Sequence, residues 1–597
     1  MRTSIATVCL SGSLTAKLHA CAEAGFDGVE IMDTDLLVSY ESPEEIRTLC
    51  ERLGLSIDLF QPFRDFEGVE EEPLQDNLRR AEEKFQLMRR LGADTVLVCS
   101  NAGTATVDDD ARVAEQLGRL ADLAAGYDIR IAYEALAWGR FVNDYRHAWK
   151  LVEMADRPNL GTCLDSFHIL ARGHDPSAIE QIPGEKIYFL QLADAPQLDM
   201  DVLSWSRHHR LFPGEGSFDL TAFLTHVLRA GYRGPLSLEV FNDTFRQTDV
   251  VSTAAHARRS LTWLADRTAA ANSWETDRLE DPQPLQDVDF VEISGNSLDD
   301  VDEMLAQLGF TFGGKHRSKP VRLWSLGESR IILNEQSRED SPRLSAVGVR
   351  VDSAEQAARR GAALGAPAVF RRTYAGEHVL HPVAAPDGTV VYWNDQPPEG
   401  TWIREFEGGD AESFDGSGRS GSRAACVDHI NLSYRWHEFE EAVLFFHSVL
   451  GLSSQDAQDV PGPQGLVRSQ VMRSTDGAVR LPLNLAPPTA PMPARHVAVG
   501  CTGIVELARA ARRRGLQFLK VPDNYYADLR AKFGLQENFL TELQELDLLY
   551  DRSDSGEFIH FYTPTLGDVF LEMVERIGDY DGYGAPNAPV RLAAQRS

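Results

Sequence analysis

The chain has 597 residues, a net charge of −31 at pH 7, 43% hydrophobic residues and a mean hydropathy of −0.28. At about 100–200 residues per domain, this length predicts two to four domains in a soluble, globular protein. The acidic balance argues against nucleic acid and anionic membranes as partners, because both require clustered Lys and Arg. We therefore expect a small-molecule substrate, and the sequence leaves a homo-oligomer open.

The cysteines and the N-terminus predict a cytoplasmic enzyme. The seven cysteines show no C-x-x-C spacing, and several lie within apolar runs, which is typical of reduced, buried thiols. The N-terminus has no basic region followed by a long apolar stretch, and no window approaches the length of a membrane span.

Strand-like and helix-like segments alternate through residues 1–268, which predicts a (β/α)₈ TIM barrel. Each strand is followed by a helical segment or a short helical turn. The eight predicted strands are Ser4–Leu10, Gly28–Met32, Leu55–Phe60, Thr95–Cys99, Ile129–Glu134, Leu160–Asp165, Ile187–Gln191 and Leu236–Val240. The main predicted helices are Thr15–Ala24, Pro43–Leu53, Leu74–Leu91, Asp108–Ala125, Asp144–Met154, Leu220–Ala230 and Ala254–Ala265.

Four oxygen-donating side chains end the last four predicted strands: Glu134, Asp165, Gln191 and Glu239. Chemistry in such barrels sits at the carboxyl ends of the strands. Hard oxygen ligands suit Mg²⁺, Mn²⁺ or a similar cation such as Co²⁺ better than thiolate-loving metals. The pattern predicts one divalent-metal site, although any one of the four alone could be an ordinary polar strand end.

Three further residues are candidates for substrate chemistry. His168 follows Asp165 by three residues and is either a proton carrier, a partner of the metal ligands or a plain histidine at a helix start. Arg64 and Arg210 lie in segments after the third and seventh strands, where a guanidinium could bind a substrate carboxylate with paired donors. The alternative for each is a solvated surface arginine.

Several motifs carry a family resemblance. They are Gly25-Phe26-Asp27-Gly28-Val29-Glu30, Tyr133-Glu134, Leu164-Asp165-Ser166-Phe167-His168, Gln191-Leu192-Ala193-Asp194 and Leu238-Glu239-Val240-Phe241-Asn242. Residues 1–268 resemble the xylose-isomerase-like barrel superfamily and, within it, the bacterial 3-dehydroshikimate dehydratases. The resemblance implies a divalent-metal-dependent elimination of water from 3-dehydroshikimate that gives protocatechuate, a step of quinate and shikimate catabolism.

The reaction requires a general base, and His168 is our prediction for it, with Glu134 and Glu239 as metal ligands. Some relatives carry a second histidine two positions after the strand-five glutamate, where this chain has Leu136. An alternative activity is a sugar or hydroxypyruvate isomerase or epimerase of the same superfamily. Such isomerases often use two glutamates as paired bases, whereas this chain offers Gln191 and the two arginines.

The rest of the chain divides into two similar units. Residues 269–285 are polar and contain proline, which predicts a linker. Residues 286–397 form a first strand–helix–strand unit, a Gly/Ser/Asp-rich linker covers 398–422, and residues 423–597 repeat the order. Internal duplication predicts an α+β region of paired βαβββ modules of the vicinal oxygen chelate type.

The second unit contains His429, His496 and Glu572 on predicted strands. Two histidines and one carboxylate are the ligands of a facial triad, which leaves positions open for substrate or O₂ when iron is bound. This unit resembles the catalytic half of 4-hydroxyphenylpyruvate dioxygenase, and the wider resemblance covers most of residues 280–590. The first unit reads Phe290-Val291-Glu292-Ile293 on its early strand, so we expect one C-terminal metal site, with Mg or Fe, and not two.

Several residues depart from the dioxygenase pattern. Leu485-Ala486 stands where the family usually has Glu-Pro, His560 stands where it tends to place a glutamine, and Gly500 and Cys501 replace the usual residues after the His-x-Ala strand. We therefore expect a dioxygenase-like metal-binding module with an unknown ligand. Arylpyruvate dioxygenase activity, a binding or oligomerisation module without turnover, and histidines that bind no metal are the alternatives.

Overall fold

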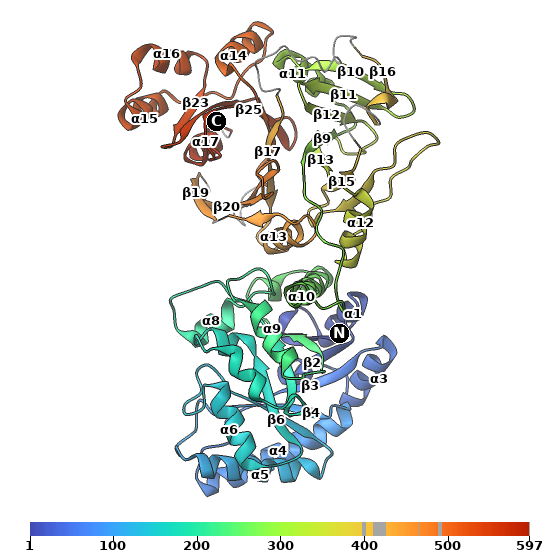
Figure 1. Cartoon of the computed structure of the whole chain (residues 1–597), viewed down its shortest axis with the longest axis vertical. Coiled ribbons are helices and arrows are strands. Elements are labelled where there is room, and N and C mark those ends of the chain that lie inside the picture. The colour runs from blue at the N-terminus through green and yellow to red at the C-terminus, as the bar shows by residue number, and fades with distance from the viewer. Residues whose placement is uncertain (397–401, 410–424, 456, 464, 487–491, 596–597) are drawn as a thin grey trace. The chain divides into compact units, whose positions relative to one another are not determined.

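The computed structural model describes residues 1–396, 402–409, 425–455, 457–463, 465–486 and 492–595. The chain divides into two compact units, Met1–Leu279 and Glu280–Ser597, which Figure 1 shows in blue to green and in green to red.

The first unit is a closed barrel of eight strands in the order β1 to β8, in which each strand pairs in parallel with its neighbours. The strands are β1 (Thr3–Ala6), β2 (Gly28–Met32), β3 (Ser56–Phe63), β4 (Thr95–Cys99), β5 (Arg130–Glu134), β6 (Leu160–Asp165), β7 (Ile187–Leu192) and β8 (Leu236–Leu238). Strands β2, β4 and β6 are buried along their whole length, as their apolar sequences require. The predicted barrel is confirmed.

Helices follow the strands along the chain. They are α1 (Leu14–Glu23), α2 (Asp33–Leu37), α3 (Pro43–Leu53), α4 (Glu71–Leu91), α5 (Asp110–Ala125), α6 (Tyr145–Ala155), α7 (Ser166–Leu170), α8 (Val202–His208), α9 (Leu220–Arg229) and α10 (Val250–Asn272). Helix α3 shows why the sequence fixes such boundaries: Ser42 and Glu45 form a capping box, Pro43 occupies the first turn, and Gly54 ends the helix in the left-handed conformation.

Several element boundaries differ from the sequence prediction, three of them near the site or at the end of the barrel. The first strand ends at Ala6, and a 3₁₀ turn, η1 (Thr7–Cys9), replaces the rest of the expected strand. Strand β8 ends at Leu238, so Glu239 lies just beyond it. Helix α10 continues past residue 268 to Asn272, where Ser273 takes a positive φ.

The second unit contains two sheets. The first sheet has the order β14-β15-β13-β9-β12-β11-β10-β16. Its strands are β9 (Asp287–Ser294), β10 (Thr311–His316), β11 (Val321–Leu326), β12 (Ser329–Asn334), β13 (Arg343–Arg350), β14 (His381–Ala384), β15 (Val390–Asn394) and β16 (Phe406–Gly408), with helices α11 (Asp299–Leu308) and α12 (Ala354–Ala363).

The second sheet has the order β18-β20-β21-β17-β22-β25-β24-β23, and β19 pairs with β20. Its strands are β17 (Val427–Tyr434), β18 (Ser453–Ser454), β19 (Gln458–Gly462), β20 (Gly465–Arg473), β21 (Arg480–Leu485), β22 (Arg495–Gly500), β23 (Leu549–Arg552), β24 (Gly556–Tyr562) and β25 (Val569–Gly578). The helices are α13 (Phe439–Ser448), α14 (Ile504–Arg513), α15 (Asp523–Phe533), α16 (Glu537–Glu545) and α17 (Ala588–Ala594).

The two sheets repeat one plan, in agreement with the predicted duplication. In the first, β9 pairs in parallel with β12, and in the second β17 pairs in parallel with β21. The predicted linker over 398–422 falls mostly outside the described residues. Its described part, 402–409, is not a linker, because it forms the turn η5 (Trp402–Glu405) and strand β16, which pairs with β10.

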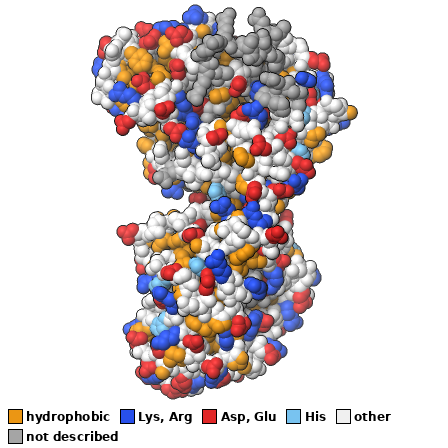
Figure 2. Space-filling view, viewed as in Figure 1, with side chains coloured by type: hydrophobic (Ala, Val, Ile, Leu, Met, Phe, Trp, Pro, Cys, Tyr) orange, Lys and Arg blue, Asp and Glu red, His pale blue; other side chains and the backbone are white. Residues whose placement is uncertain are grey.

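Surface and cysteine features agree only in part with the sequence prediction. Acidic and basic side chains are interspersed over the described part of the face in Figure 2. No described helix is both long enough and apolar enough to cross a membrane. Five cysteines are buried, but Cys426 is exposed and Cys501 is half-buried, so the expectation that the cysteines are buried fails at these two positions.

Candidate functional site

The barrel brings the predicted oxygen donors to the carboxyl ends of neighbouring strands. Glu134 is the last residue of β5, Asp165 is the last residue of β6 and faces Gln191 of β7 in the sheet register, and Glu239 follows β8. All four side chains are buried. Burying four polar groups costs free energy unless they are paired with hydrogen-bond donors or positive charge. Such a buried polar set is therefore typical of a functional site.

The sequence Asp165-Ser166-Phe167-His168 places its histidine beside its carboxylate through a helix cap. Asp165 Oδ1 accepts hydrogen bonds from the backbone nitrogens of Phe167 (2.6 Å) and His168 (3.3 Å) and so begins helix α7. This turn brings His168 Nε2 within 3.6 Å of Asp165 Oδ2 and 3.9 Å of Glu134 Oε1. Glu134, Asp165 and His168 thus form one buried cluster with the spacing of possible metal ligands.

The Arg210 guanidinium lies inside this acidic cluster. Its Nη1 donates to Asp165 Oδ2 (2.8 Å) and to Glu239 Oε2 (3.0 Å), and its Nη2 donates to Ser206 Oγ (2.9 Å) and lies 3.3 Å from His168 Nε2. Only 1% of the Arg210 side chain is exposed, so the alternative of a solvated arginine is wrong. A single guanidinium therefore bridges two of the predicted metal ligands.

A buried glutamate that the sequence analysis did not assign orients Gln191. Glu30 of β2 accepts from Gln191 Nε2 (2.6 Å), from Gln61 Nε2 (2.7 Å) and from the Ser237 hydroxyl. Because the amide nitrogen is held by Glu30, the Gln191 Oε1 atom points elsewhere and accepts from Cys163 Sγ at 3.5 Å. An acidic residue between Val29 and Ile31 in an apolar strand was the sequence signal for Glu30.

Burial sets the protonation of the cluster. Burial, and then the charge of Asp165, raises the pKa of Glu134 well above its usual range. Burial raises the pKa of Glu239 to about 7, although Arg210 opposes this shift. Burial also acts to raise the pKa of Asp165, but Arg210 and His168 outweigh it and lower that pKa. Asp165 is thus the carboxylate that Arg210 keeps ionised.

The His168 ring is neutral and can donate a hydrogen bond from Nε2. Its Nδ1 accepts from the Ala137 backbone nitrogen at 3.1 Å, which places the proton of the neutral ring on Nε2. Burial lowers the pKa of His168 to about 3, with Arg210 and Arg64 adding to this effect and Asp165 opposing it. The Trp138 ring packs against the imidazole at 5.0 Å. For Nε2 to accept a proton, the ring proton must first move to Nδ1, which requires Nδ1 to give up its hydrogen bond from the Ala137 nitrogen.

Arg64 lines the same cavity as Glu134, His168 and Arg210. Its Nε atom is buried and has no hydrogen-bond partner among the described residues. The cavity measures about 10 Å³, about the room of one water molecule, and the Arg210 side chain forms part of its wall. Arg207 and Trp138 also line the cavity, and the sequence analysis assigned a role to neither.

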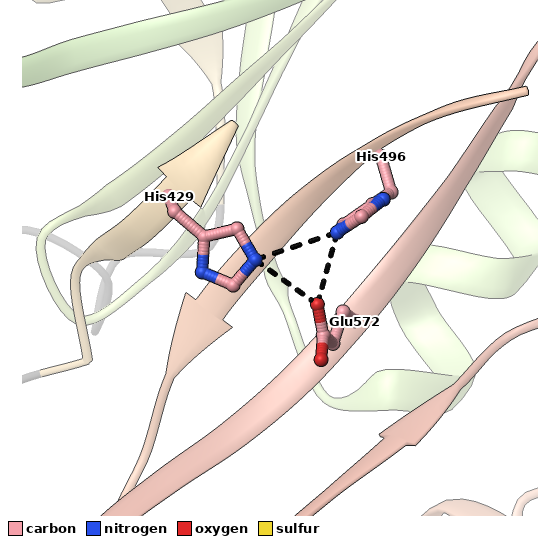
Figure 3. A group of neighbouring side chains, drawn as sticks. All are labelled: His429, His496 and Glu572. Carbon is pink, nitrogen blue, oxygen red and sulfur yellow. Dashed lines mark hydrogen bonds and ion pairs between the residues drawn. The ribbon is translucent and has the colours of Figure 1, made fainter. Parts of the chain in front are cut away.

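The second sheet of the other unit assembles the predicted triad. His429 of β17, His496 of β22 and Glu572 of β25 point toward one another (Figure 3). Glu572 Oε2 lies 3.2 Å from His429 Nε2 and 3.0 Å from His496 Nε2, and the two Nε2 atoms are 3.4 Å apart. All three side chains are buried.

Neighbouring residues fix the orientation of the triad. Asp428 Oδ1 lies 2.8 Å from His429 Nδ1, and the Arg576 guanidinium holds both Asp428 oxygens. His560, one of the departures from the dioxygenase pattern, places Nδ1 2.6 Å from Glu572 Oε1. Such partners of ligand side chains orient and tune a metal site.

Charge is shared unequally in the triad. Burial acts to lower the pKa of His429, but hydrogen bonds with Asp428 and Glu572 outweigh it and raise this pKa to about 9. Burial lowers the pKa of His496 to about 4, although Glu572 opposes this shift. Hydrogen bonds from the histidines hold the pKa of Glu572 well below its usual range despite its burial. A cavity of about 50 Å³ adjoins the triad.

Both clusters have the chemistry of metal sites. In the barrel, the Glu134 Oε1 atom is buried without a hydrogen-bond partner among the described residues, and the other donors are hard oxygens. In the second unit, two imidazole nitrogens and one carboxylate oxygen converge from three strands. A third buried cluster joins His316 of β10 to Glu377 in a loop and Glu405 in η5, and it was not predicted from the sequence.

Comparison with known families agrees with this division. Residues 18–267 match the xylose isomerase-like TIM barrel family, residues 279–406 match the N-terminal family of hydroxyphenylpyruvate dioxygenase, and residues 427–543 match the glyoxalase/bleomycin resistance protein/dioxygenase superfamily. The predicted fold class, a TIM barrel followed by vicinal oxygen chelate modules, is thereby confirmed.

Two curated relatives match along the whole chain. A 3-dehydroshikimate dehydratase of Pseudomonas aeruginosa is 43% identical over 100% of this chain and 98% of its own length. A 3-dehydroshikimate dehydratase of Pseudomonas putida is 41% identical with the same coverage. A solved xylose isomerase-like TIM barrel/4-hydroxyphenylpyruvate dioxygenase fusion protein aligns over 100% of both chains with a TM-score of 0.87 and 39% identity.

Proposed function

Because this chain belongs to the family of 3-dehydroshikimate dehydratases, which are lyases acting on a carbon–oxygen bond, we propose that its barrel eliminates water from 3-dehydroshikimate to give protocatechuate. The observation that carries the proposal is the buried set of oxygen donors at the ends of β5 to β8, beside a cavity lined by three arginines and one histidine. This set suits a substrate that carries a ketone, hydroxyls and a carboxylate.

Glu134, Asp165, Gln191 and Glu239 would hold a divalent cation in the barrel, with Mg²⁺, Mn²⁺ or Co²⁺ as candidates for an all-oxygen site. Such a cation would supply Lewis-acid chemistry at the substrate ketone, which favours loss of a proton from the ring CH₂ conjugated with that ketone. Glu30 holds the amide nitrogen of Gln191 at 2.6 Å, so the ligating atom would be the Gln191 oxygen, which accepts from the Cys163 thiol at 3.5 Å.

Arg64 and His168 are the residues that we assign to the substrate itself. Arg64 binds the substrate carboxylate, a role supported by its buried, unpartnered Nε atom on the cavity wall. His168 exchanges the proton at Nε2, which lies beside the carboxylates. This role requires its Nδ1 atom to exchange the hydrogen bond with Ala137 for an acceptor. Arg210 balances the acidic cluster and also faces the substrate.

The direct test is a dehydratase assay of the purified full chain after chelation, with Mg²⁺, Mn²⁺ or Co²⁺ added back. We expect 3-dehydroshikimate to yield a catechol that absorbs in the near ultraviolet, only when metal is present. Full activity of the chelated protein would contradict the metal role. Turnover of ketose phosphates or hydroxypyruvate in place of 3-dehydroshikimate would instead support the isomerase alternative.

The role of His168 is tested by two variants. If Nε2 takes the substrate proton, His168→Ala and His168→Gln both lower kcat by about 10²–10⁴-fold and keep metal content unchanged. If His168 only donates a hydrogen bond from Nε2, as its contact with the Ala137 nitrogen allows, His168→Gln retains most of the rate because the amide still carries a donor. The comparison of the two variants decides between the roles.

For the second unit we propose a divalent-metal site, with Mg or Fe at His429, His496 and Glu572. The convergence of the three ligand atoms within 3.4 Å supports this proposal. Metal analysis of the full chain against His429→Ala checks the ligands, since one equivalent of metal should be lost. Oxygen uptake by the Fe²⁺-loaded chain with arylpyruvates would extend the function to a dioxygenase, whereas a lack of uptake would leave a metal-binding module.

A further inference from the structure

The first sheet of the second unit lines a cavity of about 230 Å³. An engineered apolar cavity of roughly 150 Å³ accommodates benzene, so the space is sufficient for one six-membered ring with substituents. Neither the dehydratase proposal nor the triad uses this cavity.

The cavity is the counterpart of the triad cavity in the duplicated plan. Val288-Asp289-Phe290, after the first residue of β9, corresponds to Val427-Asp428-His429 at the start of β17, so Phe290 occupies the position of His429. Two residues on, Glu292 takes the place of Asn431. Each of these side chains accepts a hydrogen bond from an asparagine of the parallel neighbour strand: Asn334 for Glu292 at 3.2 Å and Asn484 for Asn431 at 2.9 Å.

The walls of this cavity separate into an aromatic part and a charged part. Phe290 and Trp402 lie edge to face at 5.1 Å, and Tyr392 lies 5.9 Å from Phe290. Together with Phe406 they form a ring-binding surface, because flat ligands pack well on aromatic faces. Opposite charges face the same space from Lys319, Arg371 and Glu292.

One cation of the wall lacks a carboxylate partner. Arg371 is half-buried, donates from Nη1 to the His378 carbonyl oxygen at 3.1 Å and forms no ion pair with any described residue. Its guanidinium lies 5.8 Å from the centre of the Tyr392 ring. The remaining guanidinium donors are therefore free for an anion that stacks beside this ring.

The buried cluster of His316, Glu377 and Glu405 builds the wall on which Lys319 lies. Glu377 accepts from Lys319 Nζ (2.7 Å), Ser318 Oγ (2.6 Å) and the Tyr374 backbone nitrogen (2.9 Å). Glu405 accepts from the His378 backbone nitrogen and lies 3.0 Å from His316 Nε2. Because these carboxylates already have donors, the cluster positions Lys319 and does not need a metal for charge balance.

Glu292 supplies an acceptor at the other side of the cavity. Besides Asn334, the Ser345 hydroxyl donates to Glu292 Oε1 at 3.1 Å, which leaves Oε2 for a ligand. Burial raises the pKa of Glu292, while Arg371 and Lys319 act in the opposite direction, so these two cations lie close to it. A ring hydroxyl is the group that pairs with such a carboxyl.

We propose that this cavity, in the module without the histidine triad, is a binding site for a monocyclic aromatic carboxylate with ring hydroxyls, whose carboxylate pairs with Arg371 and whose hydroxyl pairs with Glu292. This site goes beyond the proposed function. Only the choice of 3,4-dihydroxybenzoate as the probe rests on that function. The product of the dehydratase reaction, 3,4-dihydroxybenzoate, belongs to this chemical class, so the site would sense or retain that product.

The test is calorimetric titration of the full chain with 3,4-dihydroxybenzoate, comparing Arg371→Met with Lys315→Met. Lys315 is an exposed residue of β10 that does not line the cavity, so its variant is the matched control. We expect wild type and Lys315→Met to bind 3,4-dihydroxybenzoate at this site with the same affinity. Arg371→Met should bind it at least about tenfold more weakly or not at all, which is the effect of losing one charge-assisted hydrogen bond. Equal titrations of Arg371→Met and wild type would overturn the proposal.

A second comparison keeps the test decisive if Arg371→Met unfolds. Catechol lacks the carboxylate and should bind the wild-type site at least about tenfold more weakly. Glu292→Gln should weaken 3,4-dihydroxybenzoate but leave benzoate unchanged, because only the former has hydroxyls. Catechol binding as tight as 3,4-dihydroxybenzoate would refute the assignment. Since titration needs no turnover, failure of the dehydratase assay would leave this result interpretable.

Discussion

The barrel cluster and the histidine triad balance their negative charge in different ways. In the barrel, a guanidinium from a distant loop, Arg210, bridges Asp165 and Glu239. In the triad, the compensating charge is a proton on His429, whose pKa is raised to about 9. A metal that enters the barrel must displace or share the space of an arginine, whereas a metal that enters the triad must displace a proton. The two sites should therefore respond to different changes.

The largest expected effect is the loss of dehydratase activity in Asp165→Asn. Asparagine is also a good helix cap, so the bonds to the Phe167 and His168 nitrogens are retained while the charge is removed. Loss of the Lewis-acid contribution of several kcal/mol should lower kcat/KM at least about 10³-fold. Metal analysis and a steady-state assay measure the effect. Unchanged activity of Asp165→Asn together with a loss of barrel metal would contradict a role of that metal in the reaction.

The second effect concerns Arg210. In the metal-free chain, Arg210→Met leaves buried carboxylates without their cation, and the free energy of unfolding should fall by about 3 kcal/mol. With saturating Mn²⁺ the difference between variant and wild type should shrink, because the metal replaces the missing charge. Thermal unfolding with and without metal measures this. Arg207→Met is the control, since Arg207 lines the same cavity but bridges no carboxylates. An equal loss in both metal states would argue against charge compensation.

The strand ends were predictable from the sequence, and so was a role for Arg210 at the substrate site, but its bridge between Asp165 and Glu239 was not. Asp165 and Glu134 end apolar runs, and parallel strands of a barrel bring their carboxyl ends together whatever the loops do. Arg210 reaches Asp165 through the path of a long loop, which no local pattern records. The acidic cluster and Arg210 were therefore predicted separately, without the ion pairs that join them.

The cluster of His316, Glu377 and Glu405 in the first module was not predicted for the same reason, because loops bring its residues together. His316 ends a glycine-containing strand, Glu377 lies in a loop and Glu405 lies in a turn, so their meeting depends on tertiary packing alone. The triad of the second module was predictable because its ligands lie on strands whose local sequences carry the family resemblance. Sequence patterns thus locate residues on regular elements more reliably than residues on loops.

The third effect is the pH dependence of metal binding by the triad. At neutral pH His496 is already neutral, with its pKa lowered to about 4, whereas His429 holds a proton that must leave when metal binds. The affinity should rise about tenfold per pH unit between about pH 6.5 and pH 8 and level off above about pH 9. Titration of the Asp165→Asn chain with Co²⁺ isolates the triad.

Asp428→Asn is the matched variant for this pH dependence. Asp428 is one of the two partners that raise the pKa of His429, so the variant should lower that pKa and flatten the slope near neutral pH. A slope that stays at one proton per metal in Asp428→Asn would show that another group supplies the proton.

The smallest expected effect is that of His429→Ala on the dehydratase reaction. The barrel has its own hydrophobic core within residues 5–265, and the triad belongs to the other compact unit. Changes at sites without shared partners add within a few tenths of a kcal/mol, so kcat/KM of the barrel should change by no more than about twofold. The same variant should lose one equivalent of metal. If its dehydratase rate instead falls tenfold with the barrel metal retained, the triad takes part in the turnover of the barrel, and the two charge-balancing devices are coupled rather than separate.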